Sequence, residues 1–192
     1  MTLPNPYDYR DPFAGVSPLF VERWSPRAFD STPIDPDTLQ RVMDAARWSP
    51  SCFNEQPWRF HTATDATFDQ FVELLQEGNR GWAQHAGVIG FLSVLTRFRH
   101  NGKANASAEL DCGAAWMAMS LQARMEGLYT HAMAGIDHAA ADRYFGLDGE
   151  QQRVLIGFVI GYPADRGQLP DNLRQREQPS ARKPLAEIWQ RY

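Results

Sequence analysis

Apolar residues recur at helical spacing in several stretches of the chain. After an Asp-Pro helix start at residues 35–36, they stand at i, i+3, i+4 and i+7, the stripe of an amphipathic helix: Leu39, Val42, Met43 and Ala46. Comparable stripes predict helices at 68–75 and 107–126. Capping signals, a Ser-Pro start at 17–18 and an Asp at 137, predict helices at 17–24 and 138–145. In the longest of these, the residues predicted to face inward are Leu110, Ala114, Met117 and Leu121.

Strand patterns separate these helices. Residues 87–95 and 154–162 are apolar runs of strand length, as expected for central strands. Shorter strands are predicted at 58–62 and 129–133. The elements interleave without the regular spacing of βαβ units, so we predict an α+β sandwich rather than a doubly wound sheet.

The two ends of the chain lack a core pattern. Residues 1–16 are rich in Pro, Asp and Tyr, which predicts an arm without a core face. Residues 163–192 are polar, with several Pro and Arg, and predict an extended tail that docks on another surface. Since the chain has 192 residues, we expect one domain over 1–192.

Composition and charge narrow the class of protein. The net charge of −4 argues against binding to nucleic acid or to an anionic membrane surface. No apolar run approaches the roughly 20 residues of a membrane span. The start of the sequence lacks signal-peptide features, and Cys52 and Cys112 give no disulfide framework. A reducing cytoplasm is the expected location.

Several common catalytic motifs do not occur. The sequence holds no glycine-rich phosphate loop, no nucleophile elbow and no His spacing typical of a metal site. Cys52 has no His beside it in sequence, so we do not expect it to be a nucleophile. We expect no metal and no side chain that is obligatory as an acid or base.

Residues 23–29 form the first chemically informative stretch, Arg-Trp-Ser-Pro-Arg-Ala-Phe. Arg23, Ser25 and Arg27 bring two guanidiniums and a hydroxyl within five residues. Forked charge-assisted hydrogen bonds and a short hydroxyl donor suit a phosphate. The alternative is a solvated charged surface.

Residues 49–60, Ser-Pro-Ser-Cys-Phe-Asn-Glu-Gln-Pro-Trp-Arg-Phe, form the second stretch. Turn residues and the amides of Asn54 and Gln56 precede a predicted strand. Such a loop can offer backbone N–H groups and side-chain amides to a flat heterocycle. The alternative is a simple connection between elements.

In this order, the two stretches resemble the FMN-dependent nitroreductase family. That family typically shows Arg-x-Ser-x-Arg/Lys-x-Phe, then a helix, then Ser/Ala-Pro-Ser-x-x-Asn-x-Gln-Pro-Trp-x-Phe. Residues 133–137, 144–147, 155–163 and 182–185 also resemble family segments, so the likeness spans about residues 20–188. It implies a three-layer sandwich with a mostly antiparallel sheet, and a homodimer in which the C-terminal extension wraps the partner subunit.

The resemblance also implies roles for residues, position by position. The stretch Arg23, Trp24, Ser25 and Arg27 would hold the FMN phosphate and ribityl chain, with Arg182 and Lys183 closing from the C-terminal side. The partner subunit would line the flavin with Pro50, Ser51, Cys52, Asn54 and Gln56. The remaining flavin contacts would be Asn79, Ala132, Met133, Ala134 and Gly135.

The activity implied is hydride transfer from NAD(P)H through bound FMN to a nitroaromatic, a quinone or an activated alkene or aldehyde. The basic segment 97–105 is either a solvated loop or a lid over the flavin. Alternatives are a flavin-binding or storage protein without turnover, a dehalogenating or flavin-cleaving member, or an interaction protein that has lost the cofactor. The residues expected nearest the substrate are Phe98, Arg97, Arg99 and His131.

Two positions depart from the family pattern. Larger members often carry an acidic side chain where Ala134 stands, and a Lys where Ser180 stands. The first difference bears on substrate preference, and the second removes one potential phosphate contact.

Overall fold

The computed structural model describes residues 3–192. Its central feature is a five-stranded antiparallel sheet built on the long strand β5 (Gln152–Pro163). Strand β3 (Val88–Leu95) pairs with β5 along one edge, and β2 (Trp58–Thr62) continues the sheet from β3. On the other edge, β4 (Tyr129–Met133) pairs with β5, while β1 (Phe29–Asp30) pairs with its last two residues.

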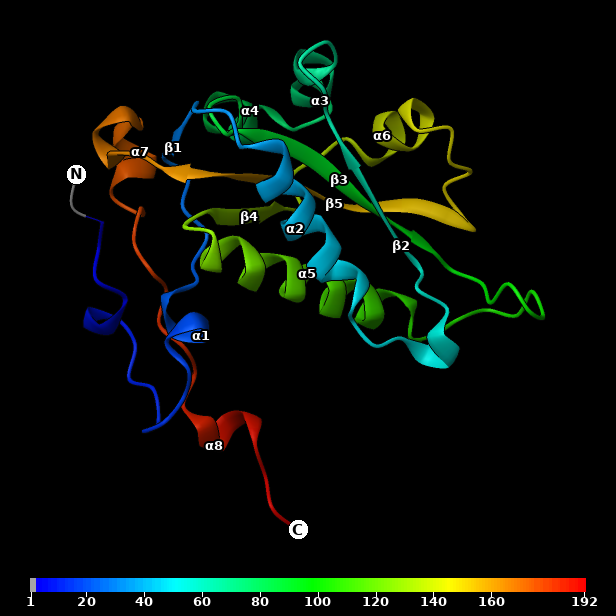
Figure 1. The fold of residues 1–192 in the computed structure, drawn as a ribbon, viewed down its shortest axis with the longest axis horizontal. Coiled ribbons are helices and arrows are strands. Elements are labelled where there is room, and N and C mark those ends of the chain that lie inside the picture. The colour runs from blue at the N-terminus through cyan, green and yellow to red at the C-terminus, as the bar shows by residue number, and fades with distance from the viewer. Residues whose placement is uncertain (1–2) are drawn as a thin grey trace.

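Helices cover both faces of this sheet, giving three layers (Figure 1). One face carries α2 (Pro36–Arg47) and α5 (Ala108–Met125), and the other carries α3 (Phe68–Glu73), α4 (Glu77–Ala83) and α6 (His138–Tyr144). Each face has its own apolar core, since alternate side chains of β3 and β5 point to opposite sides. The predicted α+β sandwich is confirmed.

The pattern of the sequence located most elements. The strands predicted at 58–62 and 129–133 have those bounds, and the long apolar runs form β3 and β5. Helix α4 and the two-residue strand β1 were not predicted, because both are too short to show a period. The predicted first helix ends earlier than expected, as α1 (Pro18–Glu22).

The predicted inward face of α5 was wrong. Leu110 is 77% exposed, and the side chains of Ala114, Met117 and Leu121 are only partly buried. The face that packs on the sheet is instead made of small and sulfur-containing side chains, which let the helix lie close to the strands. Its fully buried members are Cys112, Ala115, Met119 and Ala123.

A close approach inside the sheet explains one glycine. A Cβ at Gly90 on β3 would stand 2.4 Å from the Phe158 ring and 2.6 Å from the carbonyl oxygen of His61. Only glycine therefore fits between β2 and β5 at this point.

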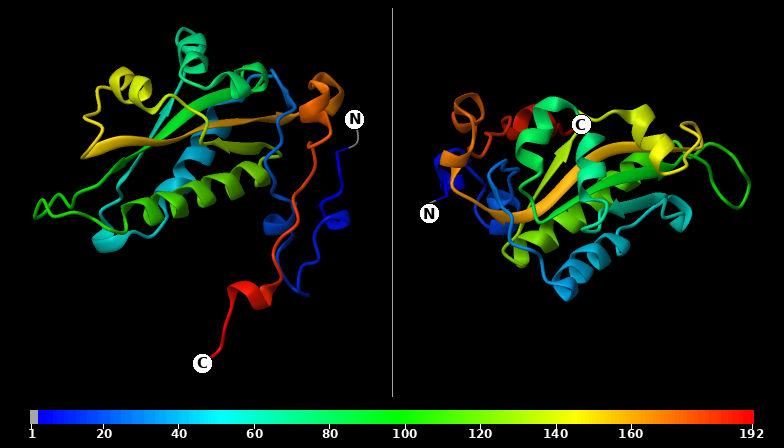
Figure 2. Two further views of the ribbon diagram at one scale, coloured as in Figure 1. Left: turned by 180° about the vertical axis from the view of Figure 1, so that it is seen from behind. Right: turned by 90° about the horizontal axis from the view of Figure 1, so that it is seen from above.

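The two ends of the chain run side by side along one end of the sandwich (Figure 2). The N-terminal arm contains the turn η1 (Pro6–Asp8), and the C-terminal extension contains η3 (Arg166–Gln168), α7 (Asp171–Arg174) and α8 (Leu185–Ile188). Contrary to prediction, the arm does contribute to a core, because its Leu3 packs against the apolar core beneath α3 and α4. Within residues 3–192, none of the helices has the length and apolar character needed to cross a membrane.

Candidate functional site: an arginine-lined cavity

The first predicted stretch lines a polar cavity of about 260 Å³ at the end of the sandwich where the two chain ends meet. Arg23, Ser25 and Arg27 all face it, as does Arg182 from the C-terminal extension. Prediction and structure therefore agree that these four side chains share one place. We call this the arginine cavity; its further lining residues are Arg10, Trp24, His131, Arg176, Gln178 and Ser180.

Five guanidinium groups around one small space make the cavity strongly electropositive. Burial lowers the pKa of Arg10 to about 10, and repulsion from Arg182 and Arg23 adds to the effect. Burial also lowers the pKa values of Arg23, with repulsion from Arg182, and of Arg27. Among the described residues that line the cavity, none is a carboxylate. The cavity thus concentrates positive charge in a way that an anion would relieve.

Arg10 was missed by the sequence analysis. Its guanidinium donates to the carbonyl oxygens of Val21 and Arg23, the latter at 2.8 Å, and to that of Ser180 at 2.9 Å. It therefore ties the arm to both walls of the cavity. A lone Arg in a Pro-rich arm has no period or motif around it, so this role could not be predicted from the sequence.

His131 lies in the arginine cavity and not beside the basic segment 97–105, where substrate contacts were expected. Its Nδ1 donates to the carbonyl oxygen of Pro26 at 2.7 Å, and its ring lies 4.6 Å from that of Trp82. Burial lowers the pKa of His131 to about 4, although the bond to Pro26 opposes that shift. The imidazole is therefore neutral near pH 7, which leaves Nε2 as a hydrogen-bond acceptor.

A second group of predicted residues meets where β4 ends. The side-chain amide of Asn79 donates to the carbonyl oxygen of Gly135 at 2.9 Å, and the backbone amide of Gln76 donates to it at 3.0 Å. A Cβ at Gly135 would stand 2.6 Å from Nδ2 of Asn79, so a larger residue there would displace the Asn79 side chain from the Gly135 carbonyl oxygen. Within residues 3–192, the amides of Ala134 and Gly135 donate to no backbone carbonyl. They remain available to a ligand.

The second predicted stretch forms what we call the amide loop, residues 51–56, which includes the turn η2 (Cys52–Asn54). Three of its residues that are not glycine have left-handed φ: Phe53 at 52°, Asn54 at 54° and Gln56 at 50°. Such backbone is costly and persists only where the surroundings hold it, most often at functional sites.

Several hydrogen bonds hold this strained loop. The amide of Cys52 donates to a carboxylate oxygen of Asp111 on α5 at 3.1 Å. The amide of Gln56 donates to Oγ of Ser51 at 2.9 Å, and the Gln56 side chain donates to Oδ1 of Asn54 at 3.0 Å. The backbone of Cys52 thus helps to anchor the loop on α5.

The segment predicted as a loop at 97–105 is a short turn-back that we call the basic hairpin, residues 97–104. Arg97 and Ala104 form an antiparallel bridge, and the Arg97 side chain donates to the carbonyl oxygen of Gly102 at 3.0 Å. The hairpin contacts the amide loop, because the Phe98 ring lies 5.7 Å from that of Phe53. These two segments therefore form one unit.

The structure does not bring all predicted site residues together. Within one chain, the amide loop lies at the far end of the sandwich from the arginine cavity (Figure 1). Lys183 also lies outside the cavity, in an exposed groove where its ammonium is 3.6 Å from the carboxylate of Glu187. The cavity is lined instead by residues that were not predicted from the sequence, including Arg10, Arg176 and Gln178.

Comparison with known proteins identifies the family. The model of the nitroreductase family matches residues 21–86 and 65–162, which is most of the chain. This chain belongs to the nitroreductase family. A Streptomyces coelicolor protein with the provisional name NADH dehydrogenase/NAD(P)H nitroreductase is 28% identical over 81% of this chain and 86% of that protein.

Solved structures of the nitroreductase family share the fold. A structure described as an oxidoreductase containing FMN is 39% identical, with a TM-score of 0.89 over 94% of this chain and 93% of that one. A Desulfovibrio desulfuricans protein, solved in complex with FMN, shares the fold at 20% identity, with a TM-score of 0.73 over 94% and 98% of the two chains.

The residues of the arginine cavity fit the phosphate end of FMN. A phosphate monoester carries close to two negative charges and three acceptor oxygens at neutral pH, which suits several guanidiniums and the Ser25 hydroxyl. The five guanidiniums therefore give the cavity an excess of positive charge that a phosphate would neutralise.

Proposed function

We propose that this protein is an FMN-dependent oxidoreductase that passes hydride from NAD(P)H to an oxidised small molecule. The observation that carries the proposal is the arginine cavity, where five guanidiniums converge with no carboxylate among the described lining residues. Support comes from the family match and from the similar structure that contains FMN. When bound, FMN would supply the redox chemistry through its N5 atom.

The residues of this chain would bind and orient the cofactor. Arg23, Arg27 and Arg182 would bind the phosphate, with Ser25 donating a hydroxyl. Arg10 would add charge while fixing the arm. Positive charge held in place by the fold needs no rearrangement to stabilise an anion, and this favours a reduced, negatively charged ring as well as the phosphate.

The amides of Ala134 and Gly135 would donate to the polar edge of the ring, and Asn79 would fix the Gly135 peptide through its carbonyl oxygen. In this proposal no side chain acts as an obligatory acid or base. Because Ala134 presents only a methyl group, the ring face beside it would be less restricted than in members with an acidic side chain there.

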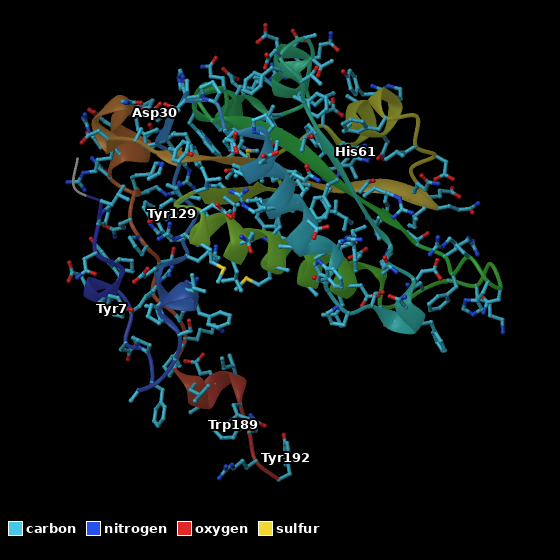
Figure 3. The ribbon with its side chains drawn as sticks, viewed as in Figure 1. Tyr7, Asp30, His61, Tyr129, Trp189 and Tyr192 are labelled. Carbon is cyan, nitrogen blue, oxygen red and sulfur yellow. The ribbon has the colours of Figure 1, made fainter. Side chains whose placement is uncertain are left out.

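The amide loop would complete the site of a partner subunit in a homodimer. Within one chain the loop and the arginine cavity are far apart, so a single chain cannot use both for one flavin. Large exposed apolar side chains favour a second copy as the partner: Leu110 and Met125 on α5, and Trp48 after α2. Trp189 and Tyr192 likewise lie in the extension that projects from the sandwich (Figure 3).

The basic hairpin would contact the substrate from the same partner subunit. Phe98, Phe53 and His100 form an aromatic cluster with ring centroids 5.4–5.7 Å apart. Such a surface suits a flat acceptor, including a nitroaromatic or a quinone. Exposed cations beside it would favour an anionic acceptor or the phosphates of the nicotinamide cofactor.

A single series of measurements tests the proposal. The purified protein should show a flavin visible spectrum, and acid release followed by chromatography should identify FMN at one per chain. Steady-state oxidation of NADH and NADPH should require menadione or a nitroarene. Flavin without turnover would instead identify a binding or storage protein. The absence of flavin after incubation with excess FMN would refute the proposal.

A further inference from the structure

Glu177 connects the C-terminal extension to the first predicted stretch. Its Oε1 accepts hydrogen bonds from the backbone amides of Arg27 at 2.6 Å and Ala28 at 2.8 Å, about 150 positions away in the chain. The side chain is only 3% exposed. A buried carboxylate that accepts two amides is a strong contact, because charge-assisted hydrogen bonds are short and persistent.

The residues on both sides of Glu177 line the arginine cavity. They have few other anchors, because the helix that precedes them, α7, has four residues and their own side chains are largely exposed. The further ties of this segment are the buried Pro179 and the bond from Arg10 to the carbonyl oxygen of Ser180. The lining residues that this segment supplies are Arg176, Gln178, Ser180 and Arg182.

The two carboxylate oxygens of Glu177 differ in their hydrogen bonding, since Oε1 accepts from two amides. Its Oε2 is buried without a hydrogen-bond partner among the described residues. The charge of Glu177 favours the ionised form of the nearby Arg27 guanidinium, so the carboxylate and the guanidinium attract each other. The two amide contacts therefore define the position of this carboxylate, and Oε1 is the atom that makes them.

We propose that Glu177 is a positioning residue that holds the C-terminal segment closed over the arginine cavity. Oε1 of Glu177 fixes the backbone of Arg27, and the Arg27 side chain lines the cavity. The same contact fixes the segment that carries Arg176 and Arg182. The distance between these two walls of the cavity is therefore fixed by Glu177. This inference rests on the proposed function for its ligand, the phosphate of FMN, but the closed segment itself does not depend on the cofactor.

Hydrogen exchange of the protein without added flavin tests the closure directly. Glu177→Ala should raise the exchange rates of amides in 176–182 at least tenfold, whereas Glu177→Gln, whose amide oxygen can accept both bonds, should stay within threefold of the parent. Asp171→Asn, an exposed carboxylate on the same extension, is the matched control and should change nothing. Equal protection in Glu177→Ala and the parent would overturn the proposal.

Flavin titration separates positioning from general damage. Glu177→Ala should weaken FMN binding at least tenfold and riboflavin binding less than twofold, because riboflavin lacks the phosphate. Glu177→Gln should restore FMN affinity, and a Gln variant as weak as Ala would contradict the role of Oε1. If Glu177→Ala does not fold, Glu177→Asp shortens the reach to the two amides and should show the same selective loss. A parent that binds no FMN would refute the proposed function, whereas the exchange result would still decide the role of Glu177.

Discussion

Arg99 donates to the carboxylate of Glu55 through both its Nε, at 2.8 Å, and its backbone amide, at 3.1 Å. The two residues are 44 positions apart, and the contact joins the basic hairpin to the amide loop. Glu55 is only 4% exposed, whereas the Arg99 side chain is 66% exposed. Arg99, expected to meet the substrate, is therefore already committed to a structural contact, which leaves Arg97 and Lys103 as the freer cations.

Arg99→Ala should lower the thermal unfolding temperature, whereas Arg97→Ala should not. Removal of the Arg99 side chain takes the Nε donor from the buried Glu55 carboxylate and the Nη2 donor from the Glu55 carbonyl oxygen, and an unsatisfied buried acceptor costs roughly 1–3 kcal/mol. Arg97 donates only to the carbonyl oxygen of Gly102 in an exposed turn. Thermal denaturation of the two variants provides the comparison, and equal midpoints would mean that the Glu55 contact adds no stability.

Arg97→Ala should instead act on the capture of charged substrates. We expect KM for the nicotinamide cofactor to rise about two- to fivefold with kcat nearly unchanged, because an exposed charge pair contributes roughly 0.2–1 kcal/mol. The effect should shrink with added salt, since exposed charges are screened over about 10 Å at 0.1 M. Stopped-flow reduction by NADH and NADPH across ionic strengths measures this, with Arg143→Ala on α6 as the control. If all constants match the parent, the basic hairpin is ordinary surface.

Arg23→Ala and Arg27→Ala should each weaken FMN binding more than they weaken the fold. One charge-assisted contact to a phosphate contributes roughly 1.5–3 kcal/mol, or about ten- to a hundredfold in affinity. Loss of the Arg23 guanidinium also relieves its repulsion with Arg182, so the Arg23→Ala apoprotein should keep its stability, whereas Arg27→Ala also removes the attraction between Arg27 and Glu177 and should cost some stability. Titration of the apoproteins with FMN tests this, and Arg41→Ala, which removes an exposed pair with Glu126, serves as control. Unchanged affinity in both variants would make the stretch a solvated surface.

Leu110→Glu should disrupt the proposed homodimer. Leu110 is 77% exposed at the start of α5, where a charge would be tolerated in a monomer but not against an apolar partner surface. Light scattering should give a single-chain mass for this variant, with loss of FMN affinity because the partner's amide loop is gone. Gln70→Glu adds a charge to an exposed site on α3, in the opposite layer, and should remain dimeric. A parent that is a flavin-loaded monomer at low concentration would contradict the assembly.

Stability should fall between pH 6.5 and pH 4 because of His131. Its pKa is about 4 when folded, below the ordinary value of 6.5, so in this range the unfolded chain binds a proton that the folded chain does not. The contribution is full above pH 6.5, and about 3 kcal/mol is lost by pH 4. Denaturant unfolding at pH 7 and pH 5 measures the slope. His131→Asn, which keeps a donor near Pro26 and cannot titrate, should flatten it, and an equal slope in both proteins would exclude His131 as the cause.

The sequence predicted elements well where a period was long enough to be read. The apolar runs of β3 and β5 and the stripe of α2 needed no information from elsewhere in the chain. The face of α5 could not be predicted in this way, because the choice between Leu110 and Cys112 depends on the space above the sheet and on what covers the outer side. The same applies to the C-terminal extension, which was expected to wrap a partner subunit but whose Leu169 and Leu173 pack on the core of their own chain.

Only part of the arginine cavity could be predicted from the sequence, for a related reason. Arg23, Ser25 and Arg27 stand close together in sequence, and Arg182 came from the resemblance to a family. Arg10, Arg176 and Glu177 carry no local motif, and only the docking of the two chain ends brings them to the same place. His131 could not be assigned from its neighbours, because its burial against Trp82 depends on a helix that the sequence pattern did not predict.

The arginine cavity draws its walls from the arm, the stretch at 23–27, strand β4 and the segment at 176–182. A ribosome makes these four parts in that order, so the last wall is added only after the sheet and both helical layers have been synthesised. A nascent chain can therefore fold its cores before it can hold a phosphate. Cofactor binding would then be the last property that the chain acquires, and a chain that loses residues 176–182 would keep the core contacts of Leu169 and Leu173 but not its cavity.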